Sequence, residues 1–180
     1  MYSAGKEYGL MRLNSEGLKC QFDAGWAGER SHGNGPRQSR SGVLITMNGM
    51  PVNWSSKRQQ IIALASAESE MYAGSEATKW VKHMAYILDE LRVGVEKPLQ
   101  LFTDSSALKH LINSGARKTL MKHVDLRAGW MEEMTDKQEI RVSFVRGVMN
   151  GSDILTKLVN GARKKEWCEK YVMEKSMMMG

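Results

Sequence analysis

The segment from Leu18 to Gly28 restricts the fold of this chain more than any other. Its first six residues alternate between apolar and polar side chains, which is the two-residue period of a strand with one apolar face. Asp23 stands on the polar side of this pattern, and Gly25 and Gly28 then mark a tight turn. The segment therefore predicts a carboxylate at the end of a half-buried strand, directly before a turn.

Three more carboxylates lie far apart in the sequence but in settings that could bring them to Asp23. They are Glu70, Asp104 and Asp153. An isolated aspartate of this kind is most often only a turn residue, so Asp23 alone would not indicate a function. Together, the four acidic residues lead us to expect one metal site.

Length and composition are those of one globular domain with a buried core. The chain has 180 residues, of which 42% are hydrophobic and 26% charged. The net charge of +6 favours a polyanionic partner only modestly.

No apolar run is long enough to cross a bilayer, so we expect no membrane partner. Cys20 and Cys168 do not suggest a disulfide framework, which favours an intracellular setting, cytoplasmic or nuclear.

The first part of the chain predicts an antiparallel meander of three strands. The strand that ends near Gly25 is followed by a polar, glycine-rich loop over residues 29–40. A second strand is expected over residues 42–47, and Asn48-Gly49 is a strong hairpin signal. A third strand follows over residues 52–57, with a proline just before it, where a missing N–H is tolerated.

From residue 66 to residue 91 the hydrophobic period becomes that of a helix. The apolar stripe consists of Ala73, Ala77, Trp80, Met84, Leu88 and Leu91. Counting back three residues from Ala73 places Glu70 on this same face. Glu68 falls on the opposite, polar side together with Tyr72 and Ser75, so we expect Glu68 to be solvated.

The second half of the chain alternates strands and helices. A short strand over residues 99–103 ends at Asp104, where a helix starts, a frequent place for functional side chains in α/β sheets. Another helix is expected over residues 122–136, then a fifth strand over residues 140–145. Asp153 then lies at the opening of a helix that runs through Leu158. The predicted fold is a five-stranded mixed α/β sheet, three antiparallel strands followed by two parallel ones, with helices on both faces.

We divide the chain into three parts on these patterns. Residues 1–17 are weakly patterned and are interpreted as a remnant linker or an extra edge segment. Residues 18–160 form the folded domain. Residues 161–180 form a C-terminal tail, which we expect to include a helix.

Five blocks of sequence, in a fixed order, connect the chain to a known family. They are Phe22–Gly28, Arg40–Val43 with Val52–Gln59, Ala65–Ala73, Thr103–Leu108, and Lys122–Arg127 with Asp153–Lys157. With these blocks the chain resembles the ribonuclease H domain that ends the Pol polyprotein of copia-type LTR retrotransposons. Gly25 is a departure, because the family often has a second aspartate at that position.

The resemblance implies a ribonuclease H-like fold and hydrolysis of the RNA strand of an RNA–DNA hybrid. It implies two Mg²⁺ ions, with Mn²⁺ as an alternative, and all-carboxylate ligands are what a hard cation of this kind prefers. Asp23 would bridge both ions, Glu70 and Asp104 would hold the ion at the leaving group, and Asp153 would hold the ion at the attacking water.

Contacts to nucleic acid are expected from polar and basic residues near these carboxylates. Candidates for recognising the sugar 2′-OH are Asn53, Ser105 and Ser106. Candidates for binding phosphates are Lys57, Arg58, Lys118 and Lys122. A reverse transcriptase domain is the protein partner that the resemblance suggests, and the oligomeric state is left open.

Other interpretations remain open at this point. Asp104 could act as a helix N-cap, alone or while binding metal, and Asp153 could be a cap with Ser152 as its rival. Four tryptophans are expected in the core rather than as stacking platforms: Trp26, Trp54, Trp80 and Trp130. At the level of function, the alternatives to a nuclease are a catalytically inactive nucleic-acid-binding remnant and a structural or protein-interaction domain.

Overall fold

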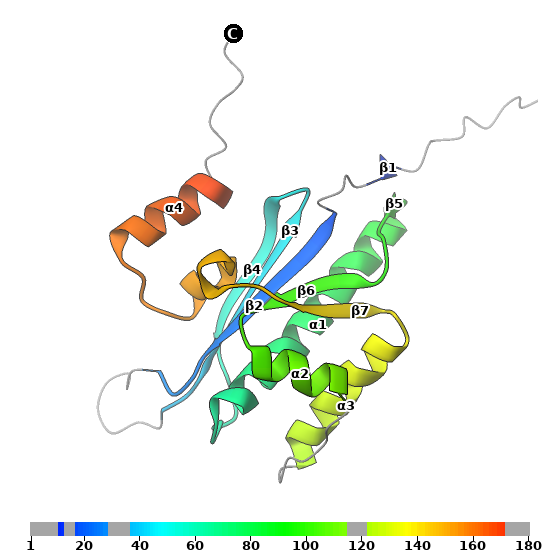
Figure 1. Cartoon of the computed structure of the whole chain (residues 1–180). Coiled ribbons are helices and arrows are strands. Elements are labelled where there is room, and N and C mark those ends of the chain that lie inside the picture. The colour runs from blue at the N-terminus through cyan, green and yellow to red at the C-terminus, as the bar shows by residue number, and fades with distance from the viewer. Residues whose placement is uncertain (1–10, 13–16, 29–36, 115–121, 172–180) are drawn as a thin grey trace, which may run out of the picture.

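Five strands form one mixed sheet in the order β4-β3-β2-β6-β7 (Figure 1). This is a computed structural model, and it describes residues 11–12, 17–28, 37–114 and 122–171. The strands are β2 Leu18–Gly25, β3 Arg40–Met47, β4 Met50–Arg58, β6 Leu99–Thr103 and β7 Ile140–Phe144. Strand β3 is antiparallel to both neighbours, whereas β6 is parallel to β2 and to β7. The predicted fold class is therefore confirmed.

The hairpin between β3 and β4 turns at Asn48 and Gly49, as predicted. Both residues have positive φ, 52° and 84°, which is the backbone of the two-residue turns that match the twist of paired strands. Pro51 lies beside a register shift opposite Ile45 and Thr46, where a residue without an N–H is tolerated. The hairpin makes β4 an edge strand of the sheet.

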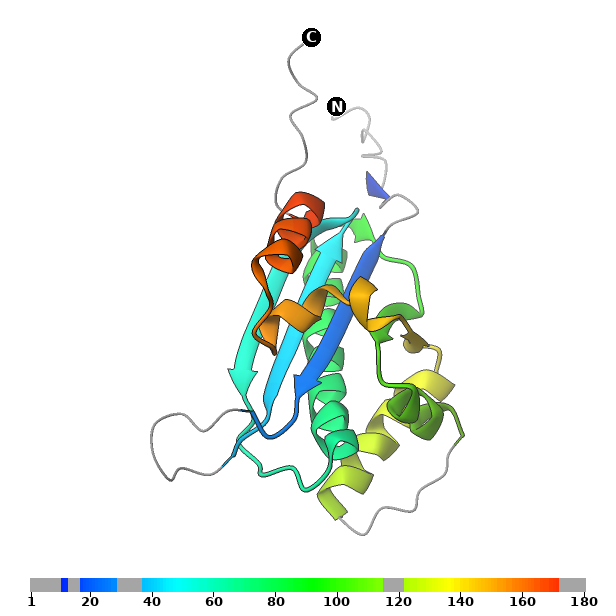
Figure 2. The ribbon, with the colours of Figure 1, turned by 60° about the vertical axis from the view of Figure 1, so that its left-hand side comes forward.

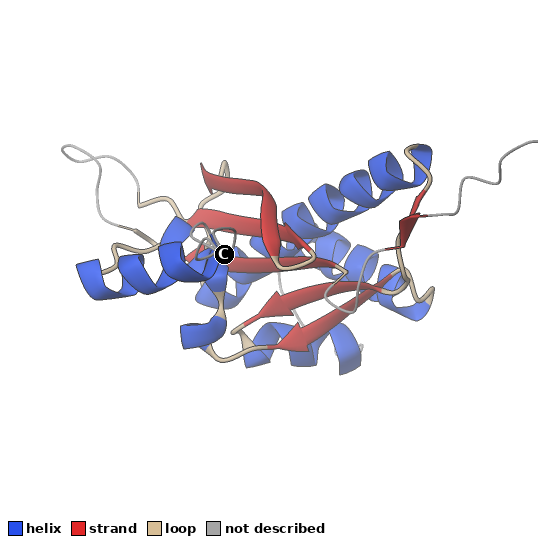
Figure 3. Ribbon diagram, turned by 90° about the horizontal axis from the view of Figure 1, so that it is seen from above, coloured by secondary structure: helices blue, strands red, loops and turns tan. Residues whose placement is uncertain are grey.

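Helical segments cover both faces of the sheet, as Figures 2 and 3 show. On one face lies α1, Ser66–Glu90, with α3, Lys122–Asp136, packed against it. Helix α2, Ser106–Ser114, contacts α3 and β7. On the other face lie the short 3₁₀ segment η2, Gly151–Leu155, and helix α4, Gly161–Tyr171.

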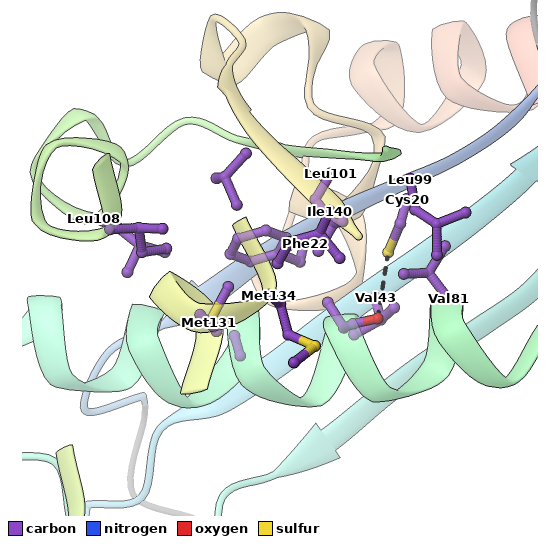
Figure 4. Close-up of a cluster of buried hydrophobic side chains, with 14 of the residues drawn as sticks. Cys20, Phe22, Val43, Val81, Leu99, Leu101, Leu108, Met131, Met134 and Ile140 are labelled. Carbon is purple, nitrogen blue, oxygen red and sulfur yellow. Dashed lines mark hydrogen bonds between the residues drawn. The ribbon is translucent and has the colours of Figure 1, made fainter. Parts of the chain in front are cut away.

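The hydrophobic core lies between the sheet and helices α1 and α3 (Figure 4). Cys20 and Phe22 of β2 are fully buried in it, and the thiol of Cys20 donates to the carbonyl of Ala77 in α1. Gly74 allows this approach, because a Cβ there would lie 3.1 Å from the Phe22 ring. The alternation predicted for β2 is therefore correct, with its apolar side facing α1.

Several tryptophans expected in the core are exposed instead. Trp26 is 50%, Trp54 63% and Trp80 40% exposed.

The predicted apolar stripe on α1 is also partly wrong: Val81 is buried, while Leu91 lies just past the helix end and is 68% exposed. The reason is that α1 packs against α3 as well as the sheet, so its buried face is broader than one stripe and includes polar residues.

The segment that carries Asp153 is shorter than predicted. It forms the single 3₁₀ turn η2, and Leu158, expected inside a helix, is 91% exposed. This turn lies directly on the sheet, because Gly42 of β3 has no side chain. A Cβ at Gly42 would lie 2.7 Å from Thr156 Cγ2 and 2.9 Å from the carbonyl oxygen of Ser152.

Helix α4 packs against this same segment. Trp167 Nε1 donates to the carbonyl of Gly151 at 2.7 Å, and the Tyr171 hydroxyl donates to Gln21 Oε1 at 3.1 Å. A helix in the C-terminal part was expected, although the division at residue 160 remains a prediction.

Near the other end of the chain, β1, Met11–Arg12, pairs in parallel with β5, Val93–Gly94.

Among the described residues, no helix combines the length and apolar character that a bilayer span requires.

Replacing Gly42 by alanine should destabilise the fold by about 1–3 kcal/mol, because the added methyl group overlaps the backbone of η2. Gly161→Ala is the matched control, since a Cβ at Gly161 meets nothing within 4 Å. Urea unfolding of both variants measures the difference. Equal stability of the two variants would show that η2 does not lie on the sheet at Gly42.

Candidate metal centre

Three carboxylates from distant parts of the chain meet at one end of the sheet. Asp23, Glu70 and Asp104 each offer a carboxylate oxygen, and these oxygens all lie within 4.8 Å of one another. Asp23 is 1% exposed, and the other two are partly buried. The predicted convergence of these three residues is confirmed.

Strand pairing brings Asp23 and Asp104 together. Strands β2 and β6 are parallel neighbours with Gln21 opposite Phe102, so Asp23 and Asp104 follow at matching positions near the carboxyl ends of the two strands. Asp104 is not the cap of the following helix, because the Ser105 hydroxyl accepts the hydrogen bond from the Leu108 N–H at 3.2 Å. The carboxylate of Asp104 is thus not engaged in helix capping.

Glu70 reaches the site from α1, whereas Glu68 does not. Glu70 accepts a hydrogen bond from the backbone of Ala24, the residue after Asp23. Glu68 is only 7% exposed, so the expectation that it is solvated is wrong. Its Oε2 accepts from the Leu64 N–H at 2.7 Å, which satisfies a donor just before the start of α1.

Burial and like charge shift the protonation of Glu70. Burial, and then the negative charges of Asp23 and Asp104, raise the pKa of Glu70 to about 8. Glu70 Oε2 is also buried without a hydrogen-bond partner. A buried carboxylate oxygen without a partner, close to two further carboxylates, is suited to act as a ligand of a cation.

Asp23 is held by two residues that follow Asp153. Its Oδ2 accepts a hydrogen bond from the Thr156 hydroxyl, and Lys157 Nζ lies 3.5 Å away. Burial raises the pKa of Asp23, and these two contacts oppose that rise. Gly25 is also explained here, because a Cβ at that position would lie 2.8 Å from the carbonyl oxygen of Thr156.

Asp153 lies beside the cluster but outside it. Lys157 Nζ is 2.6 Å from Asp153 and 3.5 Å from Asp23, so it bridges the two carboxylates. Although burial opposes it, this pairing raises the pKa of Lys157 to about 12. Asp153 is not the N-cap of its segment either, since the Asn150 side chain accepts from the Ser152 N–H.

Sequence reasoning assigned no role to Asn150 or Lys157. Asn150 is fully buried, and its Nδ2 donates to the Phe22 carbonyl at 3.0 Å and lies 3.5 Å from Asp104 Oδ1. This amide ties η2 to both acidic strand ends. The spacing of Lys157 four residues after Asp153 is the one signal in the sequence that could have indicated their ion pair.

The residues predicted to contact nucleic acid are not all close to the carboxylates. Ser105 and Ser106 directly follow Asp104 in the chain. Asn53 and Lys57 lie on the α1 face of β4, and Arg58, the last residue of this edge strand, lines the same groove as Lys57. Lys118 and the side chain of Lys122 lie outside the described residues.

This set of ligands fits a hard divalent cation. The cluster contains only carboxylates, which Mg²⁺ and Mn²⁺ prefer to nitrogen or sulfur ligands. A cation at this position would give the unpartnered oxygen of Glu70 a partner and would reduce the repulsion among the three acids.

Comparison with known proteins connects the chain to retrotransposon polyproteins. It is 32% identical over 155 residues to the retrovirus-related Pol polyprotein from transposon TNT 1-94 of Nicotiana tabacum, covering 86% of this chain and 11% of the relative. It is 24% identical over 148 residues to that of transposon RE1 of Arabidopsis thaliana, covering 82% and 10%. The chain thus spans about a tenth of the length of these relatives. No family model matches it.

Solved structures show the same fold. The LC11 ribonuclease H1 isolated from compost superposes with a TM-score of 0.57 at 18% identity, covering 83% of this chain and 97% of that one. A second structure of LC11 ribonuclease H1, in complex with an RNA/DNA hybrid, gives a TM-score of 0.54 at 16% identity, with coverages of 77% and 93%. At these identities the likeness establishes the fold.

The raised pKa of Glu70 predicts that the metal-free protein loses stability as the pH rises. The pKa of Glu70 is about 8 in the folded protein against an ordinary value of 4.5, so the stability that its bound proton contributes is complete below pH 4.5 and is lost as the pH rises through 8. Glu70→Gln removes this titration. In EDTA, its stability should rise relative to the parent by a few kcal/mol between about pH 5 and pH 9.

Urea unfolding across this pH range provides the measurement. Glu90→Gln, at the exposed end of the same helix, is the control and should follow the parent at every pH. A Glu70→Gln variant with the pH profile of the parent would contradict the raised pKa of Glu70.

Proposed function

Because this chain belongs to the ribonuclease H domains of retrotransposon Pol polyproteins, we propose that it is a metal-dependent endonuclease that hydrolyses the RNA strand of RNA–DNA hybrids. The observation that carries the proposal is the meeting of Asp23, Glu70 and Asp104 within 4.8 Å at one end of the sheet. A relative with the same fold has been solved with an RNA/DNA hybrid, which supports this class of substrate.

The three clustered carboxylates would hold divalent cations, and Asp153 would complete the set as a fourth ligand. We propose Mg²⁺ as the ion, with two ions as the working number and Mn²⁺ as an alternative. Such ions, when bound, supply an activated water and stabilise the leaving 3′ oxygen. The acidic, partly buried site supports this assignment.

The side chains of the chain would perform the positioning. The Thr156 hydroxyl donates to Asp23 Oδ2 and would fix the orientation of this carboxylate. The Asn150 amide holds η2 against the ends of the acidic strands, which keeps Asp153 within reach. Lys157, about half exposed, pairs with Asp23 and Asp153, and we propose that it contacts the substrate phosphate once metal is bound.

Recognition of the hybrid would use groups next to the acids. Ser105 and Ser106 adjoin Asp104 and are suited to the RNA 2′-OH, the group that distinguishes RNA from DNA. We further propose Lys118 and Lys122, the phosphate-binding candidates from the sequence, as phosphate contacts. Since such contacts carry no base information, cleavage is expected to be independent of sequence.

The setting of the domain is also proposed. Its relatives are long polyproteins of which it covers about a tenth, so a reverse transcriptase domain is the expected partner. The copia type is our proposal from the five ordered sequence blocks.

Asp23→Asn should abolish Mg²⁺-dependent cleavage of an RNA–DNA hybrid and reduce the Mg²⁺-induced rise in melting temperature. Without metal it should be slightly more stable than the parent, because a buried negative charge beside two other carboxylates is removed. Cleavage assays and thermal melts with and without Mg²⁺ test both points. An unchanged Mg²⁺ effect would favour the alternative, a binding remnant without a working site.

Glu70→Gln should remove most hybrid cleavage, whereas Glu68→Gln should retain it. Glu68 lies two residues away and bonds the Leu64 N–H, a contact that glutamine can keep. The cleavage rate of each variant, normalised to its folded fraction, is the measurement. The reverse order of activities would overturn the assignment of Glu70 as a ligand.

A further inference from the structure

A groove with basic and aromatic walls lies along the β4 edge of the sheet, on the face that α1 covers. It encloses about 330 Å³. Its walls are formed by Lys57 and Arg58 from β4, Tyr72 and Trp80 from α1, and Arg127 from α3. We call it the β4 groove.

The β4 groove is separate from the carboxylate cluster. Asp23 is opposite Gly42, which is opposite Ser56, so these three residues lie on the η2 face of the sheet. Lys57 is the next residue of β4 and therefore lies on the other face. Figure 2 shows η2 and α4 on one side of the sheet and α1 on the other.

The groove carries an excess of positive charge. Arg127 and Lys79 share Glu76, at 3.6 Å and 2.9 Å, so their charges are partly balanced. Among the described residues no ion pair is found for Lys57 or Arg58, and both are exposed. The open end of the groove therefore presents two cations to an incoming anion.

The aromatic wall is already organised. The Arg127 guanidinium lies 4.2 Å from the centre of the Tyr72 ring and donates to Ser75 Oγ at 2.7 Å, which holds both side chains in place. Trp80 lines the groove and is 40% exposed. Ser41 and Ser55 also line the groove.

We propose that the β4 groove binds one nucleotide unit of a single-stranded nucleic acid, with its base stacked on Trp80 and its phosphate between Lys57 and Arg58. Cations that follow a backbone, combined with an aromatic platform, are what sequence-tolerant binding of single strands requires. The volume is at the lower end of small-ligand pockets, which suits one nucleotide rather than a duplex. The groove would thus hold a strand that extends beyond a hybrid.

The test is binding of a fluorescent oligothymidylate of about a dozen residues, followed by anisotropy in EDTA. Trp80→Ala should weaken binding about fivefold or more, because it removes the ring on which the base would stack. Trp80→Phe keeps a ring and should restore most of the affinity. Lys57→Gln should reduce the slope of log K against log salt by about 0.7, as for the loss of one phosphate contact.

Two matched controls locate the effect. Trp54 is 63% exposed on the other face of β4, and Lys164 is exposed on α4, so Trp54→Ala and Lys164→Gln should bind as the parent does. Thermal melts confirm that each variant is folded. Equal losses for Trp80→Ala and Trp54→Ala, or an unchanged salt slope for Lys57→Gln, would overturn the proposal.

Competition with an acidic peptide distinguishes a nucleic-acid site from a peptide site. If an oligoglutamate peptide displaces the oligonucleotide at equal concentration, the groove is a site for acidic peptides and the proposal fails. Because the assay contains no metal and measures no cleavage, its outcome does not depend on the nuclease activity proposed above. Loss of cleavage in Asp23→Asn with intact oligonucleotide binding would support both proposals independently.

Discussion

Strand β2 is hydrogen-bonded along both edges and covered on both faces, and the other elements are arranged around it. Because side chains alternate along a strand, Phe22 enters the core against α1 while Asp23 faces η2. One residue thus anchors the fold, and its neighbour contributes to the site. A shift of one residue in register would exchange the two, placing a carboxylate in the core and an aromatic ring at the site. Packing of the core therefore specifies the position of the acid.

Holding three carboxylates together is electrostatically costly, and the structure reduces this cost in different ways. Protonation is favoured at Glu70, whose pKa is about 8. Asp23 instead receives the Thr156 hydroxyl and the charge of Lys157. A cation at this position would relieve the remaining repulsion among the three carboxylates. Metal binding and stability would then be linked through the same groups.

The second face of the sheet connects the site to the C-terminal helix. Gly42 lets η2 lie on β3, and Asn150 ties η2 to the ends of β2 and β6. Helix α4 then covers this segment, with Trp167 bonded to Gly151 and Tyr171 bonded to Gln21. The position of Asp153 therefore depends on contacts from elements that lie before and after it in the chain.

The sequence by itself determined the order of strands and helices and the identity of the acids that meet. Local patterns were sufficient for this, since the alternation in β2, the Asn48-Gly49 turn and the helical spacing of Glu70 are set by neighbouring residues. Only the tertiary structure decided the burial of Glu68 and the exposure of Trp80, because both depend on what packs against α1. The ion pair between Lys157 and Asp23 is likewise a tertiary contact, because it requires the η2 segment to pack on the sheet.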